Sequence, residues 1–183
     1  MGCGVDIYEL WCKVDLIFMI LGREAIRRLS LLEHDAMGIL GECGARVGGG
    51  ILVRTIDEAG QGGDGRSVVK AQVLAGGRGV GVFSSGLRGG VKVVNGRRER
   101  MEVVGKMLGH VLVTPQTGPE GLKCLKVRIA EPYTIVKEYY VAVFCDRNLR
   151  VPVLVGSRQG GSGVESNAAG SFISIPISFG GTL

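Results

Sequence analysis

The chain has 183 residues, of which 32 are glycine, 45% are hydrophobic and 21% are charged. The hydrophobic share excludes global disorder, and the glycine share is well above the usual frequency of roughly 7%. The net charge of +5 suits an anionic partner such as a nucleotide, a nucleic acid or an acidic protein, without choosing among them. Because aromatic residues are only 5%, the core must be aliphatic, and the glycines should lie in loops where backbone geometry matters.

Cysteine, histidine and apolar patterns exclude several classes of site. The five cysteines are odd in number, scattered and never spaced as Cys-x-x-Cys, which indicates free thiols in a reducing compartment and no zinc site. The two histidines, His34 and His110, lie far apart in the sequence, so we expect no histidine metal site. The longest apolar run, residues 16–21, is much shorter than the roughly 20 residues of a membrane span, so no membrane partner is expected.

In chain order, residues 1–28 are interpreted as a leader of unclear role. They contain Asp and Glu residues, which a mitochondrial presequence usually lacks. A helix is predicted over residues 29–44, with Ser30 and Glu33 as an S-x-x-E capping box. Residues 56–67 become glycine-rich and predict a flexible loop. Strands are predicted over residues 51–55, 67–74, 91–94, 111–114, 124–130, 139–145 and 152–156, and a second helix over residues 97–108.

These elements predict an α+β fold with a mainly antiparallel sheet, because helices and strands mix without strict alternation and short hairpins dominate the second half. Residues 116–121 and 146–148 carry turn chemistry. The basic run at residues 97–100 is interpreted as the solvated start of a helix. Cys124 and Cys145 are interpreted as buried side chains in strands.

One constellation carries chemistry: Lys70, in a strand, precedes the glycine loop Gly77-Arg78-Gly79. A lysine can neutralise phosphate oxygens, glycine-loop amides can surround an anion, and Arg78 adds a forked donor. A plain hairpin turn remains the alternative. The loop is neither a Walker A motif, since no Gly-Lys-Ser/Thr follows, nor a dinucleotide fingerprint opening a helix.

The amino-acid sequence around this loop resembles the ATP-grasp part of the succinate–CoA ligase β subunit. The resemblance covers about residues 29–165 and divides the chain into a leader (1–28), a partial ATP-grasp domain (29–165) and a divergent tail (166–183). It implies an ATP-grasp-like N-terminal subdomain with an incomplete second half. The matching segments are residues 29–34, 69–79, 85–91, 106–109, 114–118, 137–140, 146–147 and 152–161.

The resemblance also implies roles for particular residues. Lys70 matches the family's phosphate-binding lysine, and Gly77, Arg78 and Gly79 match the loop over the nucleotide. Glu131 and Glu138 match carboxylates of the nucleotide pocket, although a solvated strand-end charge is the alternative for each. The implied cofactor is ATP or GTP with Mg²⁺, and residues 29–59 are closer to the ATP type. The implied partner is the α subunit, and the implied location is mitochondrial, otherwise cytoplasmic.

The chain departs from the family at several positions. Val80 stands where lysine is usual, Gly48-Gly49-Gly50 replaces Pro-Lys-Gly, and glycines replace a helix after Ala59. The Glu-x-Asn-Pro segment that helps to hold Mg²⁺ and the CoA-side domain lie outside the matching part, so we name no catalytic and no metal residue. Neither histidine matches a phosphohistidine motif.

Three hypotheses follow. The first is the nucleotide-binding part of an ADP- or GDP-forming succinate–CoA ligase β subunit, acting in the tricarboxylic acid cycle. The second is a truncated, inactive nucleotide- or partner-binding module, with apolar surface left exposed. The third, a nucleic-acid-binding domain, rests only on basic charge and Gly–Arg pairs and lacks aromatic stacking residues. We expect no nucleic-acid partner, and no succinyl-CoA formation by this chain alone.

Overall fold

The computed structural model describes residues 11–13, 30–161, 164 and 172–177. The chain divides into two compact units, one of Leu29–Tyr133 and the other of Met1–Arg28 with Thr134–Leu183. Most of the leader and of the tail expected from the sequence lies outside the described residues. Each unit is described by itself below.

The unit Leu29–Tyr133 is built on an antiparallel sheet of four strands in the order β2-β8-β3-β5. A smaller antiparallel sheet has the order β4-β6-β7. The strands are β2 (Gly50–Val53), β3 (Arg66–Ala71), β4 (Val82–Phe83), β5 (Val91–Asn95), β6 (Val111–Val113), β7 (Leu122–Lys123) and β8 (Val127–Ala130). The helices are α1 (Glu33–Glu42), α2 (Ile56–Ala59) and α3 (Gly96–Met107). This architecture confirms the predicted α+β class.

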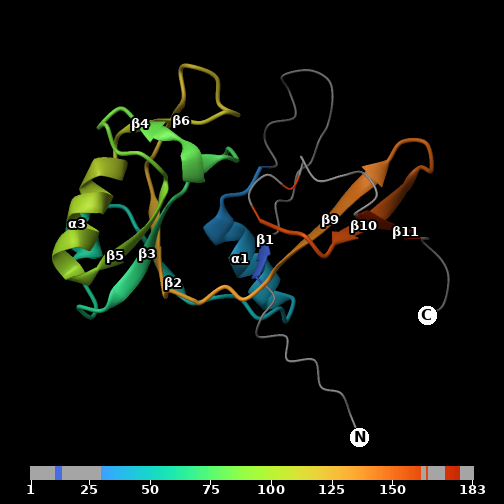
Figure 1. The fold of residues 1–183 in the computed structure, drawn as a ribbon, viewed down its shortest axis with the longest axis horizontal. Coiled ribbons are helices and arrows are strands. Elements are labelled where there is room, and N and C mark those ends of the chain that lie inside the picture. Colours follow the sequence, from blue (N-terminus) through green and yellow to red (C-terminus); the bar gives the residue numbers. More distant parts are fainter. Residues whose placement is uncertain (1–10, 14–29, 162–163, 165–171, 178–183) are drawn as a thin grey trace, which may run out of the picture. The chain divides into compact units, whose positions relative to one another are not determined.

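Successive side chains of a strand point to opposite faces, and this alternation separates the two faces of the four-stranded sheet. Val69 and Ala71 of β3 are fully buried in one apolar core, together with Val104 and Met107 of α3. Lys70, between those two strand residues, points to the other face and meets Glu33 of α1. Figure 1 accordingly shows α3 and α1 on opposite sides of the strands. The sheet therefore has an apolar face under α3 and a polar face under α1.

Arg97, Arg98 and Glu99 at the start of α3 are exposed, as predicted for the basic run, but Arg100 is buried and corrects that prediction. Its side chain is 4% exposed, and its guanidinium donates to three backbone carbonyls. The distances are 2.8 Å from Nε to Ala59 O, 3.1 Å from Nη1 to Gly63 O and 3.3 Å from Nη2 to Gln61 O. Arg100 thus fixes the glycine-rich segment after α2, because an arginine in a helix can satisfy several carbonyls at once.

The other unit contains a four-stranded sheet with the order β1-β9-β10-β11. Its strands are β1 (Trp11–Lys13), β9 (Glu138–Asp146), β10 (Val151–Ser157) and β11 (Phe172–Pro176). The β1–β9 pair is parallel and the other pairs are antiparallel. A cavity of about 310 Å³ lies against β9, β10 and β11, and Ile173 and Ile175 beside it are exposed. The association expected of such apolar surface stays a prediction.

Element boundaries differ from the predictions in ways that have physical reasons. The first helix begins at Glu33, and Leu32 precedes it without a side-chain cap, so the Ser30 capping box is wrong. The first residues of the predicted loop form α2, because Thr55 Oγ1 accepts from Glu58 N–H at 3.2 Å. Only the end of the predicted strand 124–130, residues Val127–Ala130, pairs in β8. The strands β1 and β11 were not predicted from the sequence.

Candidate anion-binding site

The candidate site lies on the α1 face of the four-stranded sheet, where two cations meet one carboxylate. Lys70 Nζ lies 3.0 Å from Glu33 Oε1, and Arg78 Nη2 donates to Glu33 Oε2. All three side chains are largely shielded, with exposed fractions of 7% for Lys70, 18% for Glu33 and 22% for Arg78. The structure therefore brings together two of the predicted phosphate-binding residues, Lys70 and Arg78, on one carboxylate.

The start of α1 is held against the end of β3 by backbone and side-chain hydrogen bonds. The backbone N–H of His34, one of the donors that a helix start leaves unpaired, donates to Gln72 Oε1 at 3.0 Å. Gln72 is buried, and its amide donates to the carbonyls of Lys70 and Ala71 at 3.3 and 3.4 Å. This tertiary cap fixes Glu33 over Lys70. The sequence pattern gave Glu33 a capping role instead, so its place in the site was missed.

The glycine loop is fixed in place by its neighbours. Gly77 has φ of +70°, which a side chain rarely adopts, and an added Cβ would lie 3.2 Å from Pro115 Cδ. The carbonyl of Arg78 accepts the N–H of Gly90 at 2.6 Å, and Gly76 N–H donates to Gln116 Oε1 at 3.0 Å. Arg78–Val80 form a short 3₁₀ turn. The loop therefore presents Arg78 from a fixed backbone.

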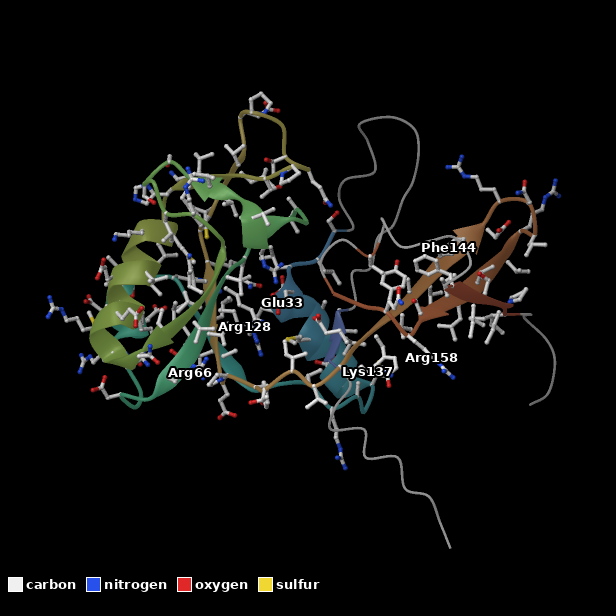
Figure 2. The ribbon with its side chains drawn as sticks, in the orientation of Figure 1. Glu33, Arg66, Arg128, Lys137, Phe144 and Arg158 are labelled. Atoms are coloured by element: carbon white, nitrogen blue, oxygen red, sulfur yellow. The ribbon has the colours of Figure 1, made fainter. Side chains whose placement is uncertain are left out.

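Arg128 is a third cation of this face, and the sequence analysis did not single it out. It lies on β8 directly opposite Lys70 in the antiparallel register. Its side chain is 3% exposed, and Nη2 donates to the carbonyls of Gly48 and Gly49 at 2.6 and 3.1 Å. Figure 2 shows Arg128 next to Glu33. A charged residue inside the run Val127–Ala130 is the signal that points to it, because arginine is rarely fully buried without a partner.

The charges of the cluster shift the pKa values of its members. Burial raises the pKa of Glu33, but the positive charges of Arg78, Lys70 and Arg128 outweigh burial and hold the pKa below 4.5. Burial lowers the pKa of Lys70, and the charges of Arg78 and Arg128 lower it further, against the opposing effect of Glu33. The carboxylate is therefore stabilised as an anion, whereas Lys70 carries its charge at a cost.

The two predicted carboxylates lie in different units. Glu131 is exposed and directly follows β8 in the unit that holds Lys70. Glu138 is the first residue of β9 in the other unit, where an added Cβ on Gly161 would lie 2.6 Å from its Oε2. The structure thus places Glu131 directly after the strand that carries Arg128, and Glu138 at the start of β9 in the other unit.

The predictions about thiols were half right, and no metal-ligand group is found among the described side chains. Cys124 is fully buried, and burial raises the pKa of its thiol, but it lies between β7 and β8 rather than in a strand. Cys145 lies in the strand β9, but it is exposed rather than buried as predicted. Within the described residues, no three His, Cys, Asp or Glu side chains converge as a group that could hold a metal ion. The side chains gathered on this face are cations around one carboxylate, so they fit an anion.

A family model described as an ATP-grasp domain matches residues 30–174, which is most of the chain. The chain belongs to the ATP-grasp family. The matched range includes Lys70, the glycine loop and both predicted carboxylates. The resemblance inferred from the motifs is thereby confirmed.

Curated relatives narrow the likeness to one branch of this family. The chain is 46% identical over 147 residues to the mitochondrial ADP-forming succinate–CoA ligase β subunit of Columba livia, covering 78% of this chain and 36% of that protein. It is 39% identical over 161 residues to the human mitochondrial GDP-forming β subunit, covering 83% and 37%. The hydrogenosomal ADP-forming β subunit of Neocallimastix frontalis is 43% identical over 146 residues, covering 78% and 33%.

The chain thus spans about a third of the length of these curated relatives. In the part of the chain that the structure describes, no helix is long and apolar enough to cross a membrane.

Proposed function

We propose that this ATP-grasp chain binds a purine nucleoside triphosphate, ATP or GTP, through its phosphates, as the nucleotide-binding part of a succinate–CoA ligase β subunit. The observation that carries the proposal is the convergence of Lys70 and Arg78 on one carboxylate beside a fixed glycine loop. Cations that already hold a carboxylate are placed to hold the oxygens of a phosphate, because both anions accept charge-assisted hydrogen bonds from lysine and arginine.

Each of the proposed binding residues has a distinct role. Lys70 acts as a point charge on a phosphate oxygen, and Arg78 donates as a fork. Gly77 allows the backbone to turn beside Pro115, and Gly79 keeps the loop free of a side chain next to the ligand. Glu131 and Glu138 are proposed to accept hydrogen bonds from the ribose hydroxyls and the base amino group, since an ionised carboxylate is an acceptor.

The resemblance to succinate–CoA ligases extends this proposal to the reaction and its partner. A nucleoside triphosphate supplies a transferable phosphoryl group when it is bound, and the protein positions it and neutralises its charge. We propose that an α subunit completes the enzyme, that Mg²⁺ accompanies the nucleotide through ligands other than the residues of this face, and that the chain acts in mitochondria. The segment over residues 29–59 favours ATP over GTP.

The proposal is tested by titrating the purified chain with a fluorescent ATP analogue and, by calorimetry, with ATP and GTP. The variants are Lys70→Ala and Arg78→Ala, and the matched control is Arg66→Ala. Arg66 lies on the same strand as Lys70 but is exposed, and Figure 2 shows it away from Glu33. Each site variant should lose roughly 10–150-fold in affinity, which is the loss expected for one charge-assisted contact, while the control should bind as the wild type does.

Binding should also weaken with added salt, because partly exposed charges are screened beyond about 8 Å at physiological ionic strength. If Lys70→Ala and Arg78→Ala bind ATP as tightly as the wild type, the glycine loop is only a turn and the proposed phosphate contacts are wrong. If the wild-type chain binds neither ATP nor GTP, the nucleotide-binding function itself is wrong.

A further inference from the structure

Unpartnered buried nitrogen atoms gather on the α1 face of the sheet. Of the buried side-chain N and O atoms in the described residues, four have no hydrogen-bond partner. Three of the four are Arg78 Nε, Arg128 Nε and Arg128 Nη1. A buried polar group without a partner is costly, so a cluster of such donors at one place points to an anion that completes it.

The room for the Arg128 head is built by a run of glycines. The Nη2 atom donates to the carbonyls of Gly48 and Gly49, and an added Cβ on Gly50 would lie 2.9 Å from Arg128 Cζ. Any side chain at position 50 would therefore collide with the guanidinium. These two hydrogen bonds use one of the three guanidinium nitrogens and leave the other two, on the same buried head, without partners.

The charges around Glu33 do not balance. Lys70, Arg78 and Arg128 contribute three positive charges, and Glu33 contributes one negative charge, so the cluster carries two uncompensated positive charges. The Arg128 charge acts on both Lys70 and Glu33, which places it within electrostatic reach of each. Lys70 and Arg128 are also directly opposite each other across two paired strands, an arrangement that is unfavourable for like charges.

We propose that Lys70, Arg78 and Arg128 form one three-cation anion site, that the Glu33 carboxylate is its resident counter-ion, and that a polyphosphate group takes the place of Glu33. A carboxylate offers two oxygens and one charge, whereas a polyphosphate offers more oxygens and charges to the unpaired donors of both arginines. This inference rests on the proposed nucleotide binding and adds to it a binding residue, Arg128, and a competing internal anion, Glu33.

The first test compares ATP and inorganic tripolyphosphate as probes of the full chain by calorimetry. Arg128→Met removes the charge and keeps an unbranched side chain, and it should weaken both ligands at least tenfold. Arg128→Lys keeps a charge without the fork and should recover part of the affinity. Arg66→Met removes an exposed arginine of the same sheet and should leave both affinities unchanged. Circular dichroism and thermal melting establish that each variant is folded.

The second test removes the resident anion rather than a cation, so it does not depend on the stability of Arg128 variants. Glu33→Gln should bind tripolyphosphate about fivefold more tightly than the wild type, because one competing unit charge is lost. The matched control is Asp35→Asn, an exposed acid on the same first turn of α1, which should change the affinity far less.

The outcomes separate this inference from the proposed function. If ATP binds and Arg128→Met binds it as the wild type does, Arg128 only clamps the glycine carbonyls, and the inference fails while the function stands. Unchanged or weaker tripolyphosphate binding by Glu33→Gln overturns the counter-ion role. If tripolyphosphate binds in an Arg128-dependent way and ATP does not, the anion site stands and the nucleotide function fails. If the wild type binds neither ligand, both fail.

Discussion

The two faces of the four-stranded sheet are held to their helices in different ways. On one face, α3 buries Arg100, Val104 and Met107, and its apolar side chains join the core. On the other face, α1 has no buried residue among its ten, and it is attached by the Glu33 contacts and by the His34–Gln72 hydrogen bond. The α3 face is built for stability, whereas the α1 face holds charge that a ligand can use.

The two buried arginines make the same contrast within one residue type. Arg100, a residue of α3, donates with all three guanidinium nitrogens to backbone carbonyls. Arg128, on the opposite face, has two nitrogens without a partner in the described structure. A fully satisfied buried arginine stabilises the fold, and a partly satisfied one adds a cost that a bound anion can offset. This difference in hydrogen bonding indicates that Arg128, rather than Arg100, is the buried cation available to a ligand.

The largest expected effect on the free energy of unfolding comes from truncating a core side chain of α3. Met107→Ala should lower the free energy of unfolding by roughly 2–5 kcal/mol, because it leaves a cavity in the core. Met37→Ala, on α1, should cost less than about 1 kcal/mol because no residue of that helix is buried. Urea unfolding of both variants measures the difference. Equal losses would show that α1 packs as α3 does.

The next effect compares the two arginines. Arg100→Met should cost about 2 kcal/mol, since it leaves buried carbonyls without a donor. Arg128→Met should change the free energy of unfolding by less than about 1 kcal/mol, because losing two hydrogen bonds is offset by removing unpaired donors and a repulsion with Lys70.

Denaturant unfolding without ligand, and again with saturating tripolyphosphate, checks this pair. The ligand should stabilise the Arg100 variant as much as the wild type and the Arg128 variant less, because only bound anion contributes to that stabilisation. The contrast between the arginines is contradicted if the unliganded Arg128 variant loses as much stability as the Arg100 variant.

Much of the fold was predictable because strand alternation and turn residues are local signals. The strand around Lys70, the helix over residues 97–108 and the hairpin at Asp146 were all found from these signals. The strands β1 and β11 pair with segments far away in the chain, and no local pattern reports such a pairing. The start of α1 was misplaced because its cap comes from Gln72, a residue of another element.

The residues of the site also divide into those predicted from a local pattern and those that depend on contacts distant in the sequence. Lys70 and Arg78 were predicted because a lysine before a glycine loop is a short-range pattern. Glu33 and Arg128 were missed because their roles depend on contacts 37 and 80 positions apart in the sequence, the first with Lys70 and the second with Gly48. From the sequence, the Gly48-Gly49-Gly50 run was interpreted only as a departure from the family. The structure shows that it makes room for a buried guanidinium.

A smaller effect on stability is expected from filling the space beside the Arg128 guanidinium. Gly50→Ala should cost roughly 1–3 kcal/mol, because the new Cβ would lie 2.7 Å from Ile129 O and 2.9 Å from Arg128 Cζ. Gly49→Ala is the matched control, since an added Cβ there has nothing within 4 Å and should change stability by less than about 0.5 kcal/mol. Tripolyphosphate affinity should fall in the first variant alone. Indistinguishable melting curves for the two would mean that the Arg128 head has room to move aside.

The smallest expected effect, and the one specific to the charged face, is the pH dependence set by Glu33. Its pKa in the folded chain is below the ordinary 4.5, so its contribution to stability is present above pH 4.5 and is lost as the pH falls through the lowered value. At neutral pH, Glu33→Gln should lower the free energy of unfolding by about 1 kcal/mol, because the amide oxygen still accepts a hydrogen bond while the charge is gone. The gap between wild type and variant should close on acidification, whereas the gap caused by Met107→Ala should persist, since burial of apolar side chains does not titrate. Urea unfolding across this pH range measures both gaps. A Glu33 gap that stays constant below pH 4.5 would show that the carboxylate contributes by packing rather than by charge, and would remove the electrostatic difference between the two faces.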